Sequence, residues 1–289
     1  MPGERGIGEP GWARAALVLA SVAVFAVMLA MPLAVVFAEA LSKSWRYALD
    51  ALSNPDALAA IRLTVLVALI VVPLNTAFGL AAAWCTVHFR FPGRALLVAL
   101  IELPFAVSPV ISGMVFVLLF GRQGWLGPLL AAHGIEIVFA LPGIVLATIF
   151  VTLPFVARQL MPLMQAQGTD EEEAALTLGA GGWQVFRRVT LPKVRWALLT
   201  GMLLCNARAM GEFGAVSVVS GHIRGVTDTM PLHIQILYDD YDIAGAFAMS
   251  ALLACLALAT LALREALTWR ARRAEERGAQ AVLATAVAA

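Results

Sequence analysis

The chain has 289 residues, of which 61% are hydrophobic and 13% charged, and its mean hydropathy is +0.85. A soluble domain is about half apolar and about a quarter charged, so this composition indicates an integral membrane protein rather than a soluble enzyme or nucleic-acid-binding domain. The three cysteines, Cys85, Cys205 and Cys255, all lie in apolar runs. They have no metal-ligand spacing and indicate no disulfide framework.

Six apolar runs are long enough to cross a membrane, since a spanning helix needs about 20 mostly apolar residues. Backbone groups in lipid must be satisfied within the segment, so these runs predict helices and an all-α fold. Pro104 and Pro109 both interrupt the third run and predict an irregular or bent span. The six predicted spans are Ala15–Phe37, Leu63–Val87, Leu96–Phe120, Ile135–Val156, Trp196–Ser220 and Ile243–Leu263.

The distribution of Lys and Arg predicts the orientation of the spans. Most of these residues fall on the side that carries both termini and the loop Arg158–Arg195, which the positive-inside rule places in the cytoplasm. The expected organisation is a cytoplasmic N-terminus (1–14), a transmembrane domain (15–264) and a disordered, Ala-rich cytoplasmic tail (265–289). A signal peptide cleaved near Ala38–Ala40 is the alternative for the first run, but that run is much longer than the apolar part of a signal peptide.

The loop between spans four and five predicts two short helices. The first begins near Thr169, with the carboxylates of 171–173 in its first turn, where they favour the positive end of the helix dipole. Gly179 then permits a turn, and a second helix over 183–188 leads to Leu191–Pro192. An amphipathic helix that packs on its own bundle is the alternative to a helix that binds a partner.

Nothing in the chain reads as a phosphate-binding loop of the form G-x-x-x-x-G-K-[ST]. The glycine cluster at 179–182 lacks the lysine and follows a helical pattern rather than a strand. Any ATP hydrolysis must therefore come from a partner protein.

Two ionisable residues, Arg208 and Glu212, lie near the middle of the fifth predicted span. Such residues cost several kcal/mol in a membrane unless they are paired or face water. They are four residues apart and can pair on one helix face. They form either a structural ion pair or a charged lining of a translocation route. The acidic and histidine residues of the loop 222–242 fit no common metal-ligand pattern.

The pattern Glu173-Ala174-Ala175, three residues, Gly179, nine residues, an aliphatic residue, one residue, Leu191-Pro192 resembles the coupling loop of ATP-binding-cassette importer permeases. Val189 fills the aliphatic position, where Ile is usual. The stretch Gly211–Ala215 resembles sulfate and molybdate permeases. The stretches 103–109, 153–158, 164–169, 216–225 and 230–233 narrow the resemblance to the W-type permease subunit of sulfate/thiosulfate importers, over about residues 62–264.

This resemblance implies the type I importer permease fold, in which Glu173, Ala174, Ala175, Gly179, Leu191 and Pro192 contact the ATPase. It implies a sister T-type permease, two copies of an ATPase that uses ATP and Mg, and a periplasmic sulfate-binding protein that docks on the loop before span six. This chain itself is expected to carry no catalytic residue, cofactor or metal. Candidate residues of the translocation path are Asn206, Arg208, Glu212, Ser108, Ser217 and Ser220.

Two alternative functions remain open from the sequence. A permease for molybdate or tungstate shares the Gly211–Ala215 pattern. A gradient-driven secondary transporter is the other alternative, but no inverted repeat supports it.

Overall fold

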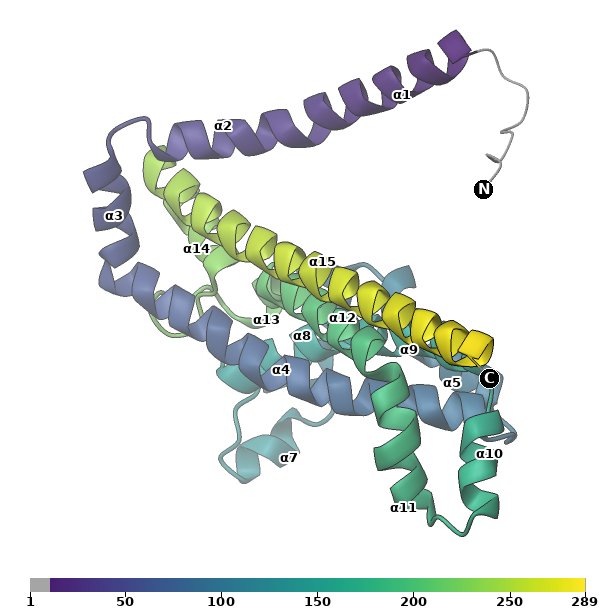
Figure 1. Ribbon diagram of the computed structural model, residues 1–289. Helices are drawn as coiled ribbons and strands as arrows, with labels where there is room; N and C mark the ends of the chain where they lie inside the picture. Colours follow the sequence, from purple (N-terminus) through teal and green to yellow (C-terminus); the bar gives the residue numbers. More distant parts are fainter. Residues whose placement is uncertain (1–10, 289) are drawn as a thin grey trace.

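A computed structural model describes residues 11–288, with side chains described to residue 270, and all regular structure in this range is helical (Figure 1). Four described helical segments are long and apolar enough to cross a membrane. A bent helix pair makes a fifth if it counts as one span. The start of the predicted cytoplasmic N-terminus, residues 1–10, lies outside the described residues.

The first predicted span is an arm on the outside of the molecule. It consists of α1 (Gly11–Phe25), a π-helical turn η1 (Ala26–Ala30) and α2 (Met31–Ala40). Ala40 is its only buried residue among those described. The arm contacts the body where α2 packs against α15 (Figure 1).

The second predicted span is longer than expected, and it contacts several other helices of the body. After α3 (Trp45–Ser53), helix α4 runs over 34 residues, Pro55–His88. The side chain of Asn54 caps it by accepting a hydrogen bond from Asp56 N at 3.0 Å. α4 packs against α8, α9, α12 and α14, so it contacts most of the described bundle.

The third predicted span is bent, as the two prolines predict. Helix α5 (Arg94–Ala106) and helix α6 (Pro109–Phe120) meet at an angle of 109°. Val107 is extended, and Ser108, which precedes Pro109, is also outside the helical region because a proline disfavours helical backbone at the residue before it. The short helix α7 (Gly127–Ala132) follows α6.

The fourth predicted span begins later and ends later than expected. It consists of α8 (Leu141–Thr152) and α9 (Pro154–Gln167), which together form one apolar segment of 27 residues. Residues 158–167, assigned from sequence to the cytoplasmic loop, form the second half of α9. Leu160 and Met164 of this half are buried, so this half belongs to the packed bundle. The loop itself starts at Gly168, which has a positive φ.

The fifth predicted span, Trp196–Ser220, is not one helix. The chain leaves the α10 (Asp170–Thr177) and α11 (Gly182–Val185) segment through a π-helical turn η2 (Phe186–Thr190) and enters α12 (Leu191–Met210). α12 ends at Gly211, and a separate helix α13 (Gly214–Val219) follows. The sequence Gly-Glu-Phe-Gly interrupts the helix because glycine lowers helix stability.

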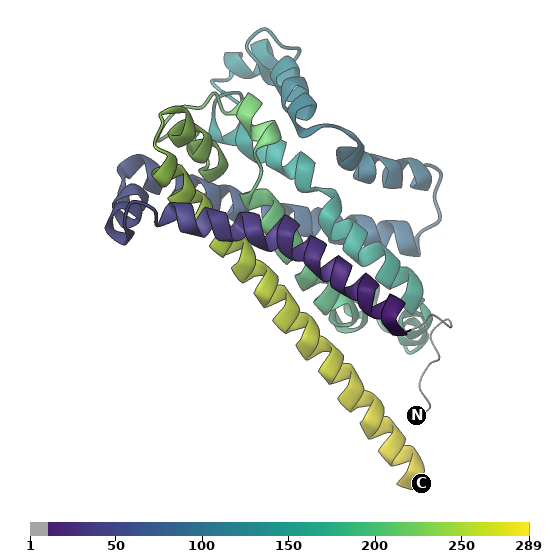
Figure 2. The same cartoon turned by 90° about the horizontal axis from the view of Figure 1, so that it is seen from above.

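The chain closes with α14 (Met230–Asp239) and the long helix α15 (Ile243–Ala288), which extends past the other helices (Figure 2). The helix continues through the tail 265–289, predicted to be disordered, as far as Ala288. Alanine, arginine and glutamate, which dominate this tail, are strong helix formers. Asp242, just before α15, accepts a hydrogen bond from Tyr47 Oη at 2.5 Å.

Asp242 is the point where α3 is held against the start of α15. Burial acts to raise the pKa of Asp242, but hydrogen bonds from Tyr47 and the Gly245 N–H and the charge of Lys43 outweigh it. The pKa therefore lies below its ordinary value. The carboxylate is the form that these donors stabilise.

The helices approach each other closely where glycine replaces larger side chains. A Cβ atom on Gly79 of α4 would lie 2.7 Å from Val156 Cβ on α9, closer than two carbon atoms pack. Asn75, one turn earlier on α4, is fully buried and donates to Thr152 Oγ1 at 2.7 Å. Small residues and polar side-chain contacts of this kind hold membrane helices together.

Candidate functional site

The most exposed part of the loop after α9 is a helical hairpin, which we call the α10–α11 hairpin and define as residues 170–190. It projects from one end of the body, opposite α3 and α14 (Figure 1). Its two limbs are joined at Gly179, which has φ +87° and no heavy atom near the position of a Cβ. Leu178 and Trp183 are exposed by 89% and 69% at this turn.

The hairpin presents part of the predicted coupling motif to solvent. Glu173 and Ala174 are exposed, and Ala175 is half-buried. Glu173 is held locally, because Thr169 Oγ1 donates to its Oε1 at 2.8 Å. The sequence predicts a cap at Thr169 or Asp170. Thr169 is the N-cap residue, but its hydroxyl makes this contact and caps no backbone N–H.

Leu191 and Pro192 do not lie with Gly179 at the turn. They are the first two residues of α12, where the second limb of the hairpin passes into the bundle. Leu191 is half-buried and Pro192 exposed. The backbone is already helical here, because the Leu191 N–H donates to the Phe186 carbonyl oxygen of η2, and Pro192 has no N–H of its own to donate. The motif therefore marks both the exposed turn of the hairpin and the junction with the membrane helix.

A contact that the sequence interpretation missed joins the hairpin to the end of α4. Glu172 is buried and lies beside Thr190 of η2 and His88, the last residue of α4. The sequence predicts a single role in the first helical turn for the three adjacent glutamates 171–173. Helical periodicity points adjacent residues in different directions, which was the available signal that their roles differ.

The two interrupted spans meet at their breaks. A Cβ on Gly214, the first residue of α13, would lie 2.9 Å from Pro109 Cβ at the start of α6. A Cβ on Gly113 of α6 would lie 2.7 Å from the Ala215 carbonyl oxygen. Non-helical backbone at membrane depth occurs where it is buried in protein or lines a polar cavity. The crossing of α6 and α13 is therefore the candidate position of a translocation site.

Arg208 and Glu212 form an ion pair beside this crossing, with Arg208 Nη1 2.5 Å from Glu212 Oε2. The pair bridges the break in the fifth span, since Arg208 is in α12 and Glu212 lies between α12 and α13. The other carboxylate oxygen accepts the Ala215 N–H at 2.9 Å and so caps α13. The Glu212 side chain is buried, whereas a third of the Arg208 side chain is exposed.

A small polar cavity of about 10 Å³ lies next to Glu212. Thr64, Thr148 and Thr229 are among the residues that line it, together with apolar residues such as Val67 and Ile144. Its volume is close to the minimum for one water molecule. Thr229 Oγ1 is buried without a hydrogen-bond partner among the described residues, which suits a bound water there.

The other predicted path residues lie in different surroundings. Asn206 lines an apolar pocket of about 350 Å³ between α4 and α12, and its amide contacts Met210 Sδ at 3.5 Å. The Ser217 hydroxyl is bonded to the Gly214 carbonyl oxygen, and Ser220 is buried. Ser108 is exposed at the α5–α6 break. The structure thus brings Arg208 and Glu212 together at the break between α12 and α13, whereas Asn206 lines a separate pocket.

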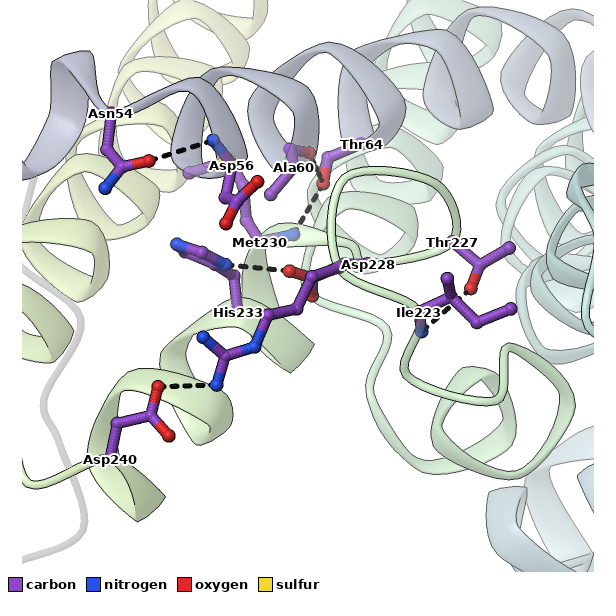
Figure 3. A network of polar contacts seen from close by, with 11 residues as sticks. Asn54, Asp56, Ala60, Thr64, Ile223, Thr227, Asp228, Met230, His233 and Asp240 are labelled. Atoms are coloured by element: carbon purple, nitrogen blue, oxygen red, sulfur yellow. Dashed lines mark hydrogen bonds and ion pairs between the residues drawn. The ribbon is translucent and has the colours of Figure 1, made fainter.

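The loop before α14 forms a polar network (Figure 3), and α14 lies at the opposite end of the body from the hairpin (Figure 1). Asp228 and His233 are both buried and are 2.7 Å apart at Oδ2 and Nδ1. The backbone N–H of Met230 donates to Thr64 Oγ1 of α4 at 2.8 Å. Asp228 and His233 therefore lie inside the fold, although the sequence assigned this loop to a docking surface. Arg224 and Asp240 pair at 2.5 Å on the exposed side. No group of three His, Cys, Asp or Glu side chains among the described residues is placed to hold a metal ion.

Comparisons with known proteins agree with this architecture. Residues 75–273 match the family described as "Binding-protein-dependent transport system inner membrane component". The chain is 51% identical over 269 residues to the sulfate transport system permease protein CysW of Escherichia coli K12, which covers 93% of this chain and 92% of that protein. It is 36% identical over 234 residues to the sulfate transport system permease protein CysT of Salmonella typhimurium, covering 81% and 84%.

A solved structure has the same fold at low sequence identity. It is a chain of a bacterial alginate ABC transporter in complex with alginate pentasaccharide-bound periplasmic protein. The TM-score is 0.74 at 17% identity, and the match covers 90% of this chain and 94% of that chain.

We predict that Arg208→Ala lowers the stability of the folded chain, because it leaves the buried Glu212 carboxylate without its cation. Breaking a fully buried pair costs about 3–5 kcal/mol. The partial exposure of Arg208 reduces this to about 2 kcal/mol, or about 5 °C in thermal midpoint. Thermal denaturation in detergent measures the change. The double variant Arg208→Ala/Glu212→Gln removes the unpaired charge and keeps an oxygen for the Ala215 N–H, so it should regain at least half of the loss. An unchanged midpoint in the single variant would show that the pair does not stabilise the fold.

Proposed function

The chain belongs to the family of binding-protein-dependent transport system inner membrane components, and we propose from this that it is a membrane-spanning permease subunit of an ATP-driven sulfate/thiosulfate importer. The observation that carries the proposal is the exposed α10–α11 hairpin, with Gly179 in a left-handed turn and Glu173 and Ala174 on its surface. The identity of 51% with a sulfate permease over 93% of the chain supports the substrate.

In the orientation that we propose, the hairpin and both chain termini lie in the cytoplasm. The Lys and Arg distribution supports it, and the hairpin itself contains Arg187 and Arg188. The loop with Arg224 and Asp240 then faces the periplasm, where a sulfate-binding protein delivers its ligand. The buried Asp228 and His233 do not contact that protein directly but hold the loop in place.

The chain requires three kinds of partner for this function. A sister permease completes the membrane pathway, and the similarity to both CysW and CysT proteins supports a heteromeric pair. Two copies of an ATPase supply the energy, and they bind the ATP and Mg. The chain lacks a phosphate-binding loop, so its own residues provide the docking hairpin and the pathway.

Transport proceeds by alternating access. ATP binding closes the two ATPase subunits, and their movement displaces the hairpins of both permeases. The helices then switch from inward-open to outward-open, sulfate enters from the binding protein, and hydrolysis returns the complex to its first state. Leu176, Leu178, Trp183 and the small residues around Gly179 are the part of the hairpin that enters the ATPase groove, since they are exposed and mostly apolar.

Arg208 is the residue best placed to attract a sulfate ion along the pathway. Its guanidinium has five N–H donors, and the ion pair with Glu212 occupies one nitrogen, Nη1. Tetrahedral oxyanions are recognised by donors of this kind. Glu212 fixes the position of the guanidinium. Its negative charge neutralises the positive charge of Arg208 when no anion is present.

We predict that Gly179→Asp abolishes uptake while the chain still inserts into the membrane. The substitution strains the left-handed turn by about 1–2 kcal/mol and adds a charge at the proposed ATPase contact. The matched control is Gly93→Asp, because Gly93 has φ +91° and open space around it but lies outside the hairpin. Uptake of radiolabelled sulfate and co-purification of the ATPase are the two measurements. Normal ATPase association with Gly179→Asp would argue against the coupling role of the turn.

We predict that Arg208→Ala reduces sulfate uptake more than it reduces assembly with the sister permease and ATPase. The stabilised double variant Arg208→Ala/Glu212→Gln isolates this effect, because it lacks the guanidinium but carries no unpaired buried charge. It should assemble normally and still transport at least tenfold more slowly. If the double variant transports at the rate of the unmodified chain, Arg208 serves only the fold.

We predict that excess sulfate and thiosulfate, but not an equal excess of molybdate or tungstate, compete with labelled sulfate for uptake. The measurement uses cells whose own sulfate importer is deleted and that express this chain with its partners. Equal competition by molybdate would favour the related oxyanion permease. Uptake that persists after removal of all ATPase partners would instead indicate a gradient-driven transporter.

A further inference from the structure

Glu172 differs from its two neighbours in the first turn of α10. Its exposed fraction is 7%, whereas Glu171 and Glu173 are exposed. A glutamate is rarely buried unless its carboxylate has partners, because removal of a charge from water is costly. Glu172 is thus an inward-facing carboxylate on a helix whose other face is offered to a partner protein.

The two oxygen atoms of Glu172 contact two different elements. Oε1 accepts a hydrogen bond from Thr190 Oγ1 of η2 at 2.9 Å. Oε2 lies 3.5 Å from His88 Nε2 at the end of α4. Glu172 Oε2 and His88 Nε2 are shielded from solvent, and neither has a hydrogen-bond partner among the described residues. They are therefore each other's polar neighbours.

The position of His88 is suited to an anionic neighbour. Its Nδ1 is 3.3 Å from the Trp84 carbonyl oxygen, so each ring nitrogen faces an oxygen acceptor. An imidazolium ring donates on both sides. His88 is also the last residue of α4, and a positive side chain is favoured at a helix C-terminus.

Aromatic stacking fixes the second limb of the hairpin to the same helix end. The Trp84 and Phe186 rings are stacked with centroids 4.7 Å apart, and Phe186 stacks in turn on Trp183 at 5.5 Å. The Glu172 carboxylate supplies the corresponding attachment for the first limb. Both limbs are thus connected to the last turn of α4.

Helix α4 reaches from this attachment to the opposite end of the molecule. It is 34 residues long, begins beside the network around Asp56 and Thr64 (Figure 3), and lines the cavity next to Glu212 through Thr64 and Val67. Its backbone is helical from Pro55 to His88, although Pro73, which lies between the two ends, has no N–H and leaves one helical hydrogen bond unmade. Because the helix is otherwise uninterrupted, movement of its C-terminal end reaches the residues beside the break in the fifth span.

We propose that Glu172 is a positioning residue that ties α10 to α4, so that displacement of the hairpin by the ATPase moves α4 rather than α10 alone. This inference rests on the proposed function. It separates the roles of two adjacent glutamates: Glu173 lies on the face offered to the ATPase, and Glu172 transfers the movement to the membrane helices.

The test uses the full complex in proteoliposomes, with the sister permease, the ATPase and the binding protein. Glu172→Gln is compared with Asp170→Asn, because each removes one negative charge from the same helical turn and keeps the side-chain shape. Asp170 is exposed. Three quantities are measured: ATPase co-purification, ATP hydrolysis stimulated by the binding protein, and sulfate taken up per ATP hydrolysed.

In Glu172→Gln, we expect ATPase co-purification within twofold of the unmodified complex and at least a tenfold lower uptake per ATP. Asp170→Asn should leave all three quantities within twofold. An unchanged uptake per ATP in Glu172→Gln would overturn the proposal, as would loss of ATPase co-purification, which would assign Glu172 to docking. Absence of ATP-dependent uptake by the unmodified complex would instead contradict the proposed function itself.

A second variant pair tests whether the effect passes through α4. If Glu172 acts through His88, then His88→Ala should lower uptake per ATP to a similar extent. The double variant Glu172→Gln/His88→Ala should then be no worse than either single variant, because interacting residues are non-additive. Multiplied losses in the double variant would show that the two residues act independently and would overturn the connection to α4.

Discussion

The hydrocarbon interior offers no hydrogen-bond partners, so every polar group placed within it must find one inside the protein. This constraint accounts for the internal contacts of the bundle. Asn75 binds Thr152 across two helices, and Thr64 receives the backbone N–H of Met230. Glu212 serves Arg208 and the first turn of α13 together. The first two contacts join segments far apart in the chain and fix how the helices cross, whereas the contacts of Glu212 connect the two helices on either side of one break.

Much of the fold follows from the sequence because apolar length and proline position are local properties. The bend of the third span was predicted from Pro104 and Pro109, and the turn at Gly179 from glycine between two helical patterns. The errors have a common cause. The fifth run is apolar enough to suggest a continuous helix, yet Gly211 and Gly214 end it where α13 must cross α6. Such a crossing is a tertiary requirement that hydrophobicity does not express.

The candidate site was predictable in part. The pairing of Arg208 with Glu212 follows from their spacing, and the structure shows the two side chains in contact. Their role in transport stays a prediction. The partners of Glu172 were not predictable, because His88 is 84 residues away in sequence and only the packing of α4 brings it to the hairpin. A buried glutamate beside an exposed one cannot be recognised from residue type.

The hairpin has two faces with different demands. Its outer face is small and apolar around Gly179, which suits insertion into a groove. Its inner face carries a carboxylate and an aromatic stack that hold it to one helix end. A contact that only docked the ATPase would need the first face alone. The second face carries the contacts on which the proposed connection to α4 rests.

The π-helical turn at Phe186–Thr190 gives a physical reason why the number of residues between Gly179 and Leu191 matters as well as their identities. A π-helical turn accommodates an additional residue within an α-helix. Each α-helical residue rotates the chain by about 100°, since a turn holds 3.6 residues. Gain or loss of one residue between Gly179 and Leu191 would rotate the hairpin about its own axis by that amount. Glu172 and Phe186 would then face away from α4, although every side chain would still be present. The number of residues in this segment therefore determines the direction in which the hairpin faces.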